Sequence, residues 1–296
     1  MLDQTRIYQT IEVKLLAGAL GAEIFGVDLS EKMNEETFSE IHQAWLDHLV
    51  IFFRDQDITS EQFLAFVKQF GEIHTHPLMQ GLEECPEILE ILKTEESTYT
   101  FGNSWHTDQI FTEQPAKASI LYAKEVPPYG GDTLFANMYA AYEALSDGYR
   151  AMIDPLMVLN KGDNYKRRKQ TGVAMSRAER YASGKTAMKL KEQPDENRVT
   201  ESVHPLVRTH PETKRKSLYI SVNSETLVGF GEPEADIIID QLREHAMKPE
   251  FGCRFRWEAG SIAMWDNRCT QHYAIGDYQG SRRRMHRLMV KGDKPV

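Results

Sequence analysis

The sequence has few cysteines and no long hydrophobic run. Only three of its 296 residues are cysteine, and none of them has the C-x-x-C spacing of a zinc ribbon. The odd number also excludes a closed disulfide framework, and a chain of this length can bury enough surface to fold without one. The longest apolar runs, such as residues 49–53, are far too short to cross a bilayer. The first dozen residues include Asp3 and Glu12 and lack a signal-peptide pattern, so we expect a cytoplasmic protein with no membrane partner.

Basic residues are fewer than acidic ones. The chain has 35 Lys and Arg against 44 Asp and Glu, a net charge of −9, which argues against a nucleic-acid partner or a polybasic membrane binder. No internal repeat or low-complexity tract divides the chain, and we expect one domain over residues 1–296. Residues 161–198 differ, because they hold eleven Lys and Arg against five Asp and Glu. We interpret them as a lid-like insert over the mouth of a barrel, and the alternative is a solvated surface insert.

Strand patterns dominate the middle and the end of the chain. Helices are predicted over residues 34–48, 59–71, 137–145 and 233–247. The second begins at the capping-box spacing of Thr59 and Gln62 and ends at Gly71. Strands are predicted as a short pair within 7–27 and at 48–53, 118–124, 134–135, 206–207, 218–222, 253–257, 262–265 and 285–290. Because these strands do not alternate regularly with helices, the pattern favours an antiparallel sandwich or barrel with flanking helices.

One histidine and one carboxylate have the spacing of metal ligands. His106 and Asp108 are two residues apart, which places both side chains on one face of a strand. Such a pair is weak evidence alone, and we interpret the similar pair His210 and Glu212 as part of a surface turn. The first pair gains weight from His272, which lies near the end of a predicted strand. Two histidines and one aspartate can form the three-ligand face of non-haem Fe(II) oxygenases, with open positions for a chelating 2-oxo acid and O₂.

Two arginines follow His272 on a predicted strand. Arg283 and Arg287 are four residues apart, so both point to the same face of that strand. A guanidinium group offers a bidentate fork for a carboxylate, as the far end of a dicarboxylate cofactor requires. The strand therefore supplies two candidate anion-binding groups beside the candidate metal site.

Several motifs occur in the order of one enzyme family. They are FGEIHTHP at 70–77, WHTD at 105–108, GGDT at 130–133, YAAYEAL at 139–145, HPLVRTHP at 204–211 and WDNRCTQHYA at 265–274. Over nearly its whole length the sequence resembles the TauD/TfdA family of Fe(II)/2-oxoglutarate-dependent dioxygenases. The resemblance implies a mainly β fold with a double-stranded β-helix, or jelly-roll, core and a homo-oligomeric assembly. It also implies that His106, Asp108 and His272 bind Fe(II), that Thr133 and Arg283 bind 2-oxoglutarate, and that O₂ is the second co-substrate.

The resemblance is weaker in the substrate pocket. His76 and Arg287 match positions that contact the sulfonate in taurine-oxidising members of the family. Where those members have a pocket tyrosine this chain has Met79, and where they have an asparagine it has a glycine followed by Asn103. A pocket phenylalanine is replaced, with Thr226 at the equivalent position. The sequence thus predicts a small anionic substrate that is larger or more apolar than taurine, such as an alkyl sulfate, another sulfonate or an aryloxyalkanoate.

Hydroxylation is the reaction that the resemblance implies. Hydroxylation next to a heteroatom makes the product collapse, with cleavage of a C–O or C–S bond. Two alternatives remain from the residues alone. Two histidines and a carboxylate also suit a zinc-type hydrolase, and the same groups could serve a non-catalytic 2-oxoglutarate or anion sensor.

Overall fold

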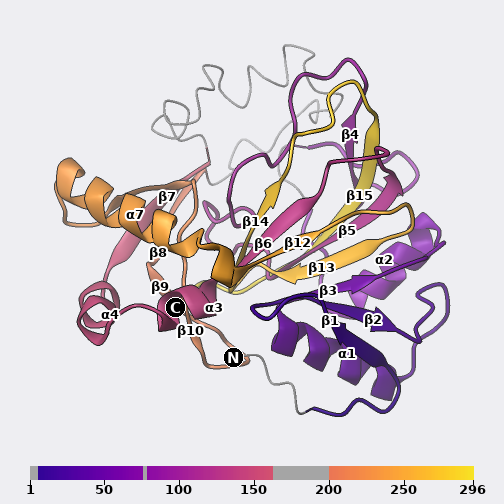
Figure 1. Cartoon of the computed structure of the whole chain (residues 1–296), viewed down its shortest axis with the longest axis horizontal. Coiled ribbons are helices and arrows are strands. Elements are labelled where there is room, and N and C mark those ends of the chain that lie inside the picture. The colour runs from indigo at the N-terminus through magenta and orange to yellow at the C-terminus, as the bar shows by residue number, and fades with distance from the viewer. Residues whose placement is uncertain (1–5, 76–78, 163–199) are drawn as a thin grey trace.

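Two packed β-sheets form the centre of the molecule in the computed structural model, which describes residues 6–75, 79–162 and 200–296 (Figure 1). The larger sheet has seven strands in the order β1-β2-β3-β13-β5-β15-β4, and the smaller has the order β12-β6-β14. The strands of the larger sheet are β1 (Glu12–Leu15), β2 (Ala22–Phe25), β3 (Val50–Phe53), β4 (Leu89–Lys93), β5 (Ala118–Glu125), β13 (Ile262–Asp266) and β15 (Arg283–Val290). Those of the smaller sheet are β6 (Thr133–Asn137), β12 (Gly252–Phe255) and β14 (Thr270–Ala274).

Aromatic side chains fill the space between the two sheets. The ring of Phe52 on β3 stacks on Phe255 of β12, with centroids 3.9 Å apart, and meets the edge of Phe135 on β6 at 5.8 Å. All three side chains are fully buried. Every pairing within these two sheets is antiparallel except that of β2 with β3. This mainly β architecture is a jelly-roll core with flanking helices, so the fold class predicted from the sequence is confirmed.

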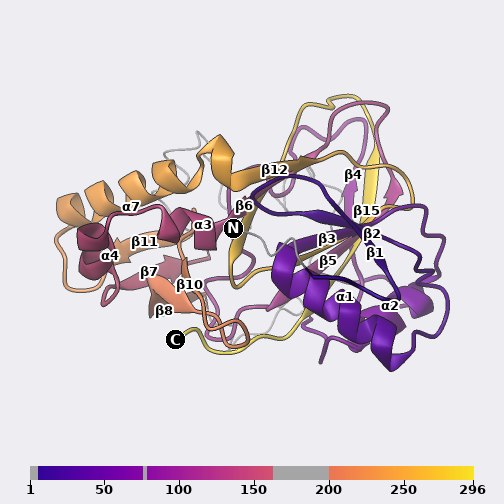
Figure 2. The ribbon, with the colours of Figure 1, turned by 60° about the horizontal axis from the view of Figure 1, so that its bottom comes forward.

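Two helices cover the outer face of the larger sheet, as Figure 2 shows. Helix α1 (Glu35–His48) begins where the side chain of Asn34 accepts a hydrogen bond from the Thr37 backbone. Helix α2 (Ser60–Lys68) begins with the expected capping box, in which Thr59 and Gln62 each bond to the other's backbone. Both helices bury their apolar faces in one cluster with β3, β5 and β13. These helices therefore support, from its outer side, the sheet to which β5 and β15 belong.

A satellite region lies on the other side of the smaller sheet (Figures 1 and 2). It contains the sheet β11-β7-β8, the hairpin β9-β10 and helix α7 packed around one apolar cluster. Its elements are α3 (Met138–Glu143), α4 (Asp147–Ile153), β7 (Met157–Lys161), β8 (Glu201–Pro205), β9 (Val207–Thr209), β10 (Lys216–Leu218), β11 (Ser224–Leu227), α7 (Glu232–Ala246) and the 3₁₀ turn Pro249–Phe251. It is built by the part of the chain between β6 and β12 of the smaller sheet.

The structure departs from the sequence predictions in one predicted strand, and it also has strands that were not predicted, such as β4 and β7. The strand expected over 218–222 ends at Leu218, because only residues 216–218 pair with β9 and the next three residues are buried without belonging to a strand. Apart from Lys161 and Gly162, the basic insert at 161–198 lies outside the described residues, and its lid role stays a prediction. Within the described ranges, no helix has both the length and the apolar character needed to cross a membrane.

Candidate active site

The three predicted metal ligands lie together beside β14, an edge strand of the smaller sheet. His272 is on β14, where it pairs with Phe135 of β6. His106 lies in the segment before β5 and forms an isolated antiparallel bridge with His272, with backbone hydrogen bonds of 3.0 and 2.9 Å in the two directions. Asp108 follows two residues later. The backbone therefore fixes the spacing of the two imidazoles, and their ring centroids are 4.1 Å apart.

The ligand atoms of the three side chains converge. Nε2 of His106 is 3.6 Å from Oδ1 of Asp108, and Nε2 of His272 is 3.8 Å from Oδ2. One ligand atom from each residue lies within 4.8 Å of the other two. Nδ1 of His106 is 2.6 Å from the Ser104 carbonyl oxygen, to which it donates, so the lone pair is on Nε2. Such an outer hydrogen bond is usual for a metal-binding histidine, because it fixes the tautomer and the ring orientation.

The charges around these groups favour a cation. Burial opposes the ionisation of Asp108, but Arg287, His272, His106 and the Ser119 hydroxyl together hold its pKa well below the ordinary value. Burial, with a further contribution from His106, lowers the pKa of His272 well below the ordinary range. The carboxylate is thus ionised and the His272 imidazole neutral at pH 7, as metal binding requires. The donor set fits a divalent transition metal with open coordination positions.

A pocket opens beside the three residues. It has about 420 Å³ of empty space, part of it continuous with solvent. His106, His272, Thr133, Arg283 and Arg287 all line it. The predicted strand parity is therefore correct, because the two arginines reach the same pocket from one face of β15. Apolar side chains complete the wall, among them those of Ile91, Phe101 and Leu121.

Arg283 brings an unsatisfied positive charge into this pocket. Its side chain is 6% exposed, and its Nε and Nη2 atoms have no hydrogen-bond partner among the described residues. The guanidinium carbon lies 5.7 Å from the centre of the Trp257 ring. Nε1 of the same tryptophan donates a 2.9 Å hydrogen bond to Oγ1 of Thr133. A buried guanidinium with free donors requires an anion, and Thr133 adds a hydroxyl on the same side.

Arg287 contacts one of the candidate metal ligands directly. Its Nη2 atom forms an ion pair with Oδ2 of Asp108 and lies 3.3 Å from Oγ of Ser119. Its Nε atom has no hydrogen-bond partner in the described part of the chain. Arg287 therefore neutralises a buried carboxylate and retains a donor for a second anion.

Comparison with known proteins identifies the family. The model of the taurine catabolism dioxygenase TauD, TfdA family matches residues 12–289. The chain belongs to this family. It is 33% identical to an alkylsulfatase of Acinetobacter baylyi over 96% of this chain and 86% of the relative. It is also 33% identical to an alpha-ketoglutarate-dependent sulfate ester dioxygenase of Pseudomonas putida over 97% and 91% of the two chains. A solved taurine dioxygenase of Burkholderia xenovorans is 36% identical, with a TM-score of 0.79, covering 97% of this chain and 93% of that one.

Membership of the TauD/TfdA family makes this protein a 2-oxoglutarate-dependent dioxygenase. The substrate residues expected from the family are less clearly placed than the metal and 2-oxoglutarate residues. His76 lies outside the described residues. Met79 is buried against Leu89, in a small cluster that packs against Ile91 and Phe101 of the pocket wall. Asn103 is exposed in the loop before His106 and does not line the described pocket.

Sequence reasoning missed several buried polar residues around the pocket. Ser119 donates a 2.7 Å hydrogen bond to Asp108, and Asn267 donates to Ser119 at 2.9 Å. Gln109, directly after Asp108, has a φ of 52°, in the left-handed region that non-glycine residues rarely adopt. Ser119 lies within an apolar strand and carried no sequence signal. Asn267 belongs to the WDN motif and could have been singled out from it.

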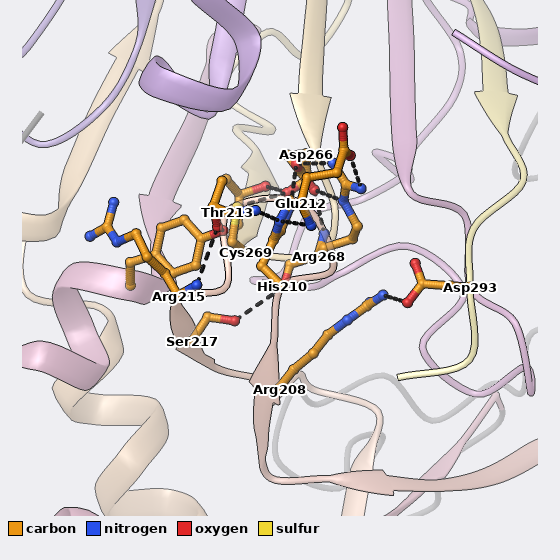
Figure 3. Close-up of polar contacts among 12 residues, drawn as sticks. Arg208, His210, Glu212, Thr213, Arg215, Ser217, Asp266, Arg268, Cys269 and Asp293 are labelled. Carbon is orange, nitrogen blue, oxygen red and sulfur yellow. Dashed lines mark hydrogen bonds and ion pairs between the residues drawn. The ribbon is translucent and has the colours of Figure 1, made fainter. Parts of the chain in front are cut away.

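One sequence interpretation was wrong. His210, expected in a surface turn, is fully buried, and its Nε2 atom lies 3.0 Å from Oδ2 of Asp266 (Figure 3). The turn exists, because His210 accepts a backbone hydrogen bond from Lys214, but the imidazole points inward to a carboxylate. Glu212 is partly exposed and pairs with Arg268, whose guanidinium also binds both oxygens of Asp266.

This second cluster is an ion-pair network rather than a second metal site. His210, Asp266 and Cys269 lie close enough together to hold an ion. However, Arg268 already places a positive charge against both oxygens of Asp266. Burial also raises the pKa of Cys269 well above its ordinary value, so its sulfur stays a neutral thiol. The network instead fixes the turn that leads into β14.

Proposed function

We propose that the protein is an Fe(II)/2-oxoglutarate-dependent dioxygenase that oxidises small organic anions, with sulfate esters as the first class to test. His106, Asp108 and His272 hold the Fe(II). The convergence of two imidazoles and one ionised carboxylate on one point is the observation that carries this proposal. Three protein ligands leave three positions for a bidentate 2-oxo acid and O₂. Bound iron supplies the oxidising chemistry, and the chain supplies binding and orientation.

Arg283 and Thr133 bind the distal carboxylate of 2-oxoglutarate. Two guanidinium nitrogens of Arg283 have no partner in the described part of the chain, which supports this assignment because burying them without an anion is unfavourable. Thr133 accepts a hydrogen bond from Trp257, which leaves its own hydroxyl proton free to donate to a carboxylate oxygen. Both residues lie on the pocket wall with His106 and His272, so one molecule can reach the metal and this anchor together.

Arg287 and His76 bind the anionic group of the primary substrate, with Met79 and Asn103 as further contacts. The free Nε atom of Arg287 supports its part in this arrangement. Apolar side chains at Ile91, Phe101 and Leu121 suit a hydrocarbon body attached to the anion. Relatives named as an alkylsulfatase and a sulfate ester dioxygenase act on substrates of this kind.

Hydroxylation of the carbon beside the ester oxygen would lead to cleavage of the C–O bond of a sulfate ester. One oxygen atom of O₂ enters succinate as 2-oxoglutarate loses CO₂, and the other becomes a hydroxyl group on the substrate carbon. The resulting hemiacetal-like sulfate loses hydrogen sulfate and leaves an aldehyde. The protein needs no hydrolytic nucleophile for this step, because the C–O bond breaks by collapse of the product.

Substrate-stimulated succinate release tests the proposal. Purified protein with Fe(II), ascorbate, 2-oxoglutarate and O₂ is incubated with a panel of alkyl sulfates, sulfonates and aryloxyalkanoates. We expect succinate and sulfate to appear in equal amounts with alkyl sulfates. Sulfate release without 2-oxoglutarate consumption would instead indicate a zinc-type hydrolase, and 2-oxoglutarate binding without any turnover would indicate a sensor.

Loss of the carboxylate ligand tests the metal assignment. Asp108→Ala removes the only anionic ligand, so we expect no metal binding at this site and no succinate formation. Asp293→Asn is the matched control, because Asp293 pairs with Arg208 away from the pocket. Turnover of the Asp108 variant near the wild-type rate would remove this residue from the active site.

Three further proposals concern the whole chain. We expect one domain, a homo-oligomer and a cytoplasmic location. Light scattering after size-exclusion chromatography measures the mass of the assembly, and a mass of 34.0 kDa, that of one chain, would contradict the oligomer.

A further inference from the structure

A chain of hydrogen bonds runs from the core of the molecule to Oδ2 of Asp108. Nε1 of Trp265 donates to Oδ1 of Asn267 at 3.0 Å. Nδ2 of Asn267 donates to Oγ of Ser119 at 2.9 Å, and Ser119 donates to Oδ2 of Asp108 at 2.7 Å. All four side chains are buried, with Ser119 fully inaccessible.

The chemistry of the first donor sets the direction of the whole chain. An indole Nε1–H can only donate, so the atom of Asn267 that faces Trp265 is the amide oxygen. The amide NH₂ group then faces Ser119, whose oxygen accepts this bond and must direct its own proton elsewhere. Asp108 is the acceptor that remains. The proton order is therefore fixed from the tryptophan to the carboxylate, and the carboxylate receives its hydrogen bond as an anion.

Two backbone contacts hold the relay in register. Ser119 on β5 lies directly opposite Trp265 on β13 in the larger sheet. The backbone N–H of Asn267 donates a 2.9 Å bond to the carbonyl of Lys117, two residues before Ser119. The position of the Ser119 hydroxyl is thus set by regular strand pairing rather than by a loop.

We propose that Ser119 and Asn267 are positioning residues that hold the Asp108 carboxylate in its metal-binding orientation and thereby set the affinity of the site for a divalent metal. This inference rests on the proposed role of Asp108 as a ligand. Arg287 also contacts Oδ2 and the Ser119 hydroxyl, but it is assigned to the substrate anion, whereas Ser119 donates directly to the carboxylate. Hydrogen-bond partners of metal ligands typically change metal affinity 10- to 100-fold when they are removed.

Metal titration of the apoprotein tests the inference without turnover. The Kd for Mn(II) is measured from the electron paramagnetic resonance signal of free Mn(II) for the wild type, Ser119→Ala, Asn267→Ala and the double variant. We expect Ser119→Ala to weaken binding about 10- to 100-fold and Asn267→Ala to weaken it less. Because Asn267 acts through Ser119, its removal should change the Kd no further in the Ser119→Ala background.

Two further variants complete the experiment. Ser224→Ala is the matched control, since Ser224 is a buried serine on β11 whose hydroxyl donates at 2.8 Å to Asn160, and its Kd should equal that of the wild type. Ser119→Cys keeps a weak donor of similar shape and should give an intermediate Kd if the alanine variant does not fold.

The outcomes separate this inference from the proposed function. If Asp108→Ala binds Mn(II) as tightly as the wild type, the metal-site assignment itself is wrong. If Asp108→Ala loses Mn(II) but Ser119→Ala and Ser119→Cys bind like Ser224→Ala, only the positioning role is overturned. An Asn267 effect that persists in full without Ser119 would likewise overturn the relay.

Discussion

Arg283 and Arg287 present the same chemical group to the pocket, but their neighbours differ. Two guanidinium nitrogens of Arg283 have no hydrogen-bond partner among the described residues, whereas Arg287 forms an ion pair with Asp108. Loss of one partner of a buried charged pair costs about 2–5 kcal/mol, or roughly thirty- to several-thousand-fold in affinity. We expect Arg283→Ala to raise the KM for 2-oxoglutarate and Arg287→Ala to raise that for the primary substrate. Steady-state kinetics with each compound varied in turn measure both.

Each arginine variant serves as the control for the other. In Arg287→Ala, anaerobic binding of 2-oxoglutarate to the metal-loaded protein should survive. The opposite pattern of KM values, or an equal loss of 2-oxoglutarate binding in both variants, would contradict the division of roles.

Trp257 contacts both parts of the proposed 2-oxoglutarate anchor, through its Nε1 atom to Thr133 and its ring to Arg283. Trp257→Phe keeps a ring beside the guanidinium and removes the hydrogen bond. One such bond contributes about 0.5–1.5 kcal/mol, so we expect 2-oxoglutarate binding to weaken about 2- to 12-fold. Anaerobic titration of the metal-loaded protein measures it.

A second tryptophan provides the comparison for this variant. Trp45→Phe changes a buried indole on α1, and its Nε1 atom has no partner among the described residues. It should leave 2-oxoglutarate binding unchanged. Equal effects of the two substitutions would show that Trp257 acts only through general stability.

At the scale of elements, the β9-β10 hairpin is tied to helix α1 and to the turn before β14 by one carboxylate. Glu212 bonds to His42 of α1 and to Arg268 of that turn. The hydrogen bond from His42 and the charge of Arg268 lower the pKa of Glu212 to about 2, against the opposing effect of burial. Its stabilisation is therefore complete above the ordinary pKa of 4.5 and is lost as the pH falls towards 2.

Acid denaturation tests this contribution. We expect Glu212→Gln to reduce the free energy of unfolding at pH 7, and the difference from the wild type to shrink as the pH is lowered from 5 towards 2. Urea unfolding at several pH values measures it. Glu113→Gln, at an exposed ion pair with Lys294, should show little difference at any pH. A Glu212 difference that stays constant with pH would contradict the assigned cause.

Local signals were sufficient for some elements and not for others. The capping box of Thr59 and Gln62 predicted the start of α2, because caps depend on neighbouring residues alone. The satellite strands β7, β8 and β11 were not predicted. They are short, and their pairing depends on segments at least 40 residues apart in the sequence, as between Lys161 and Glu201 or between Asn160 and Ser224. The prediction for His210 was wrong for a similar reason, since its partner Asp266 comes from a distant strand.

The candidate site was more predictable than the fold around it. The spacing of His106 and Asp108, together with the motif that contains His272, pointed to the three residues that the structure brings together as candidate ligands. Strand parity placed Arg283 and Arg287 on one face of a strand, as both line the pocket, whereas their separate roles were inferred from the family resemblance. The sequence did not predict the residues that hydrogen-bond to the candidate ligands, because a serine such as Ser119 in an apolar strand gives no sign of what lies opposite it.

For the whole molecule, the pocket lies where the two sheets meet. His272 comes from the smaller sheet, and both arginines come from the larger one. Ligands that bridge the sheets should therefore stabilise the entire fold. We expect Mn(II) and 2-oxoglutarate, each at 100 times its Kd without oxygen, to add about 2.7 kcal/mol apiece to the free energy of unfolding.

Thermal unfolding with each ligand alone and with both measures this stabilisation. Arg283→Ala should lose the increment from 2-oxoglutarate and keep the one from the metal. A variant that loses both would indicate that Arg283 is needed for the fold itself.

The backbone bridge between His106 and His272 means that this centre is preorganised. The entropy lost in bringing the two imidazoles together is lost on folding and does not weaken metal binding. In a zinc finger, by contrast, the ion itself drives folding. Treatment with a chelator should thus yield a folded apoprotein with an unchanged far-ultraviolet circular dichroism spectrum. Readdition of one equivalent of metal should restore full occupancy without a refolding step. Collapse of the spectrum on chelation would show that the ion, and not the strand pairing, assembles the ligands.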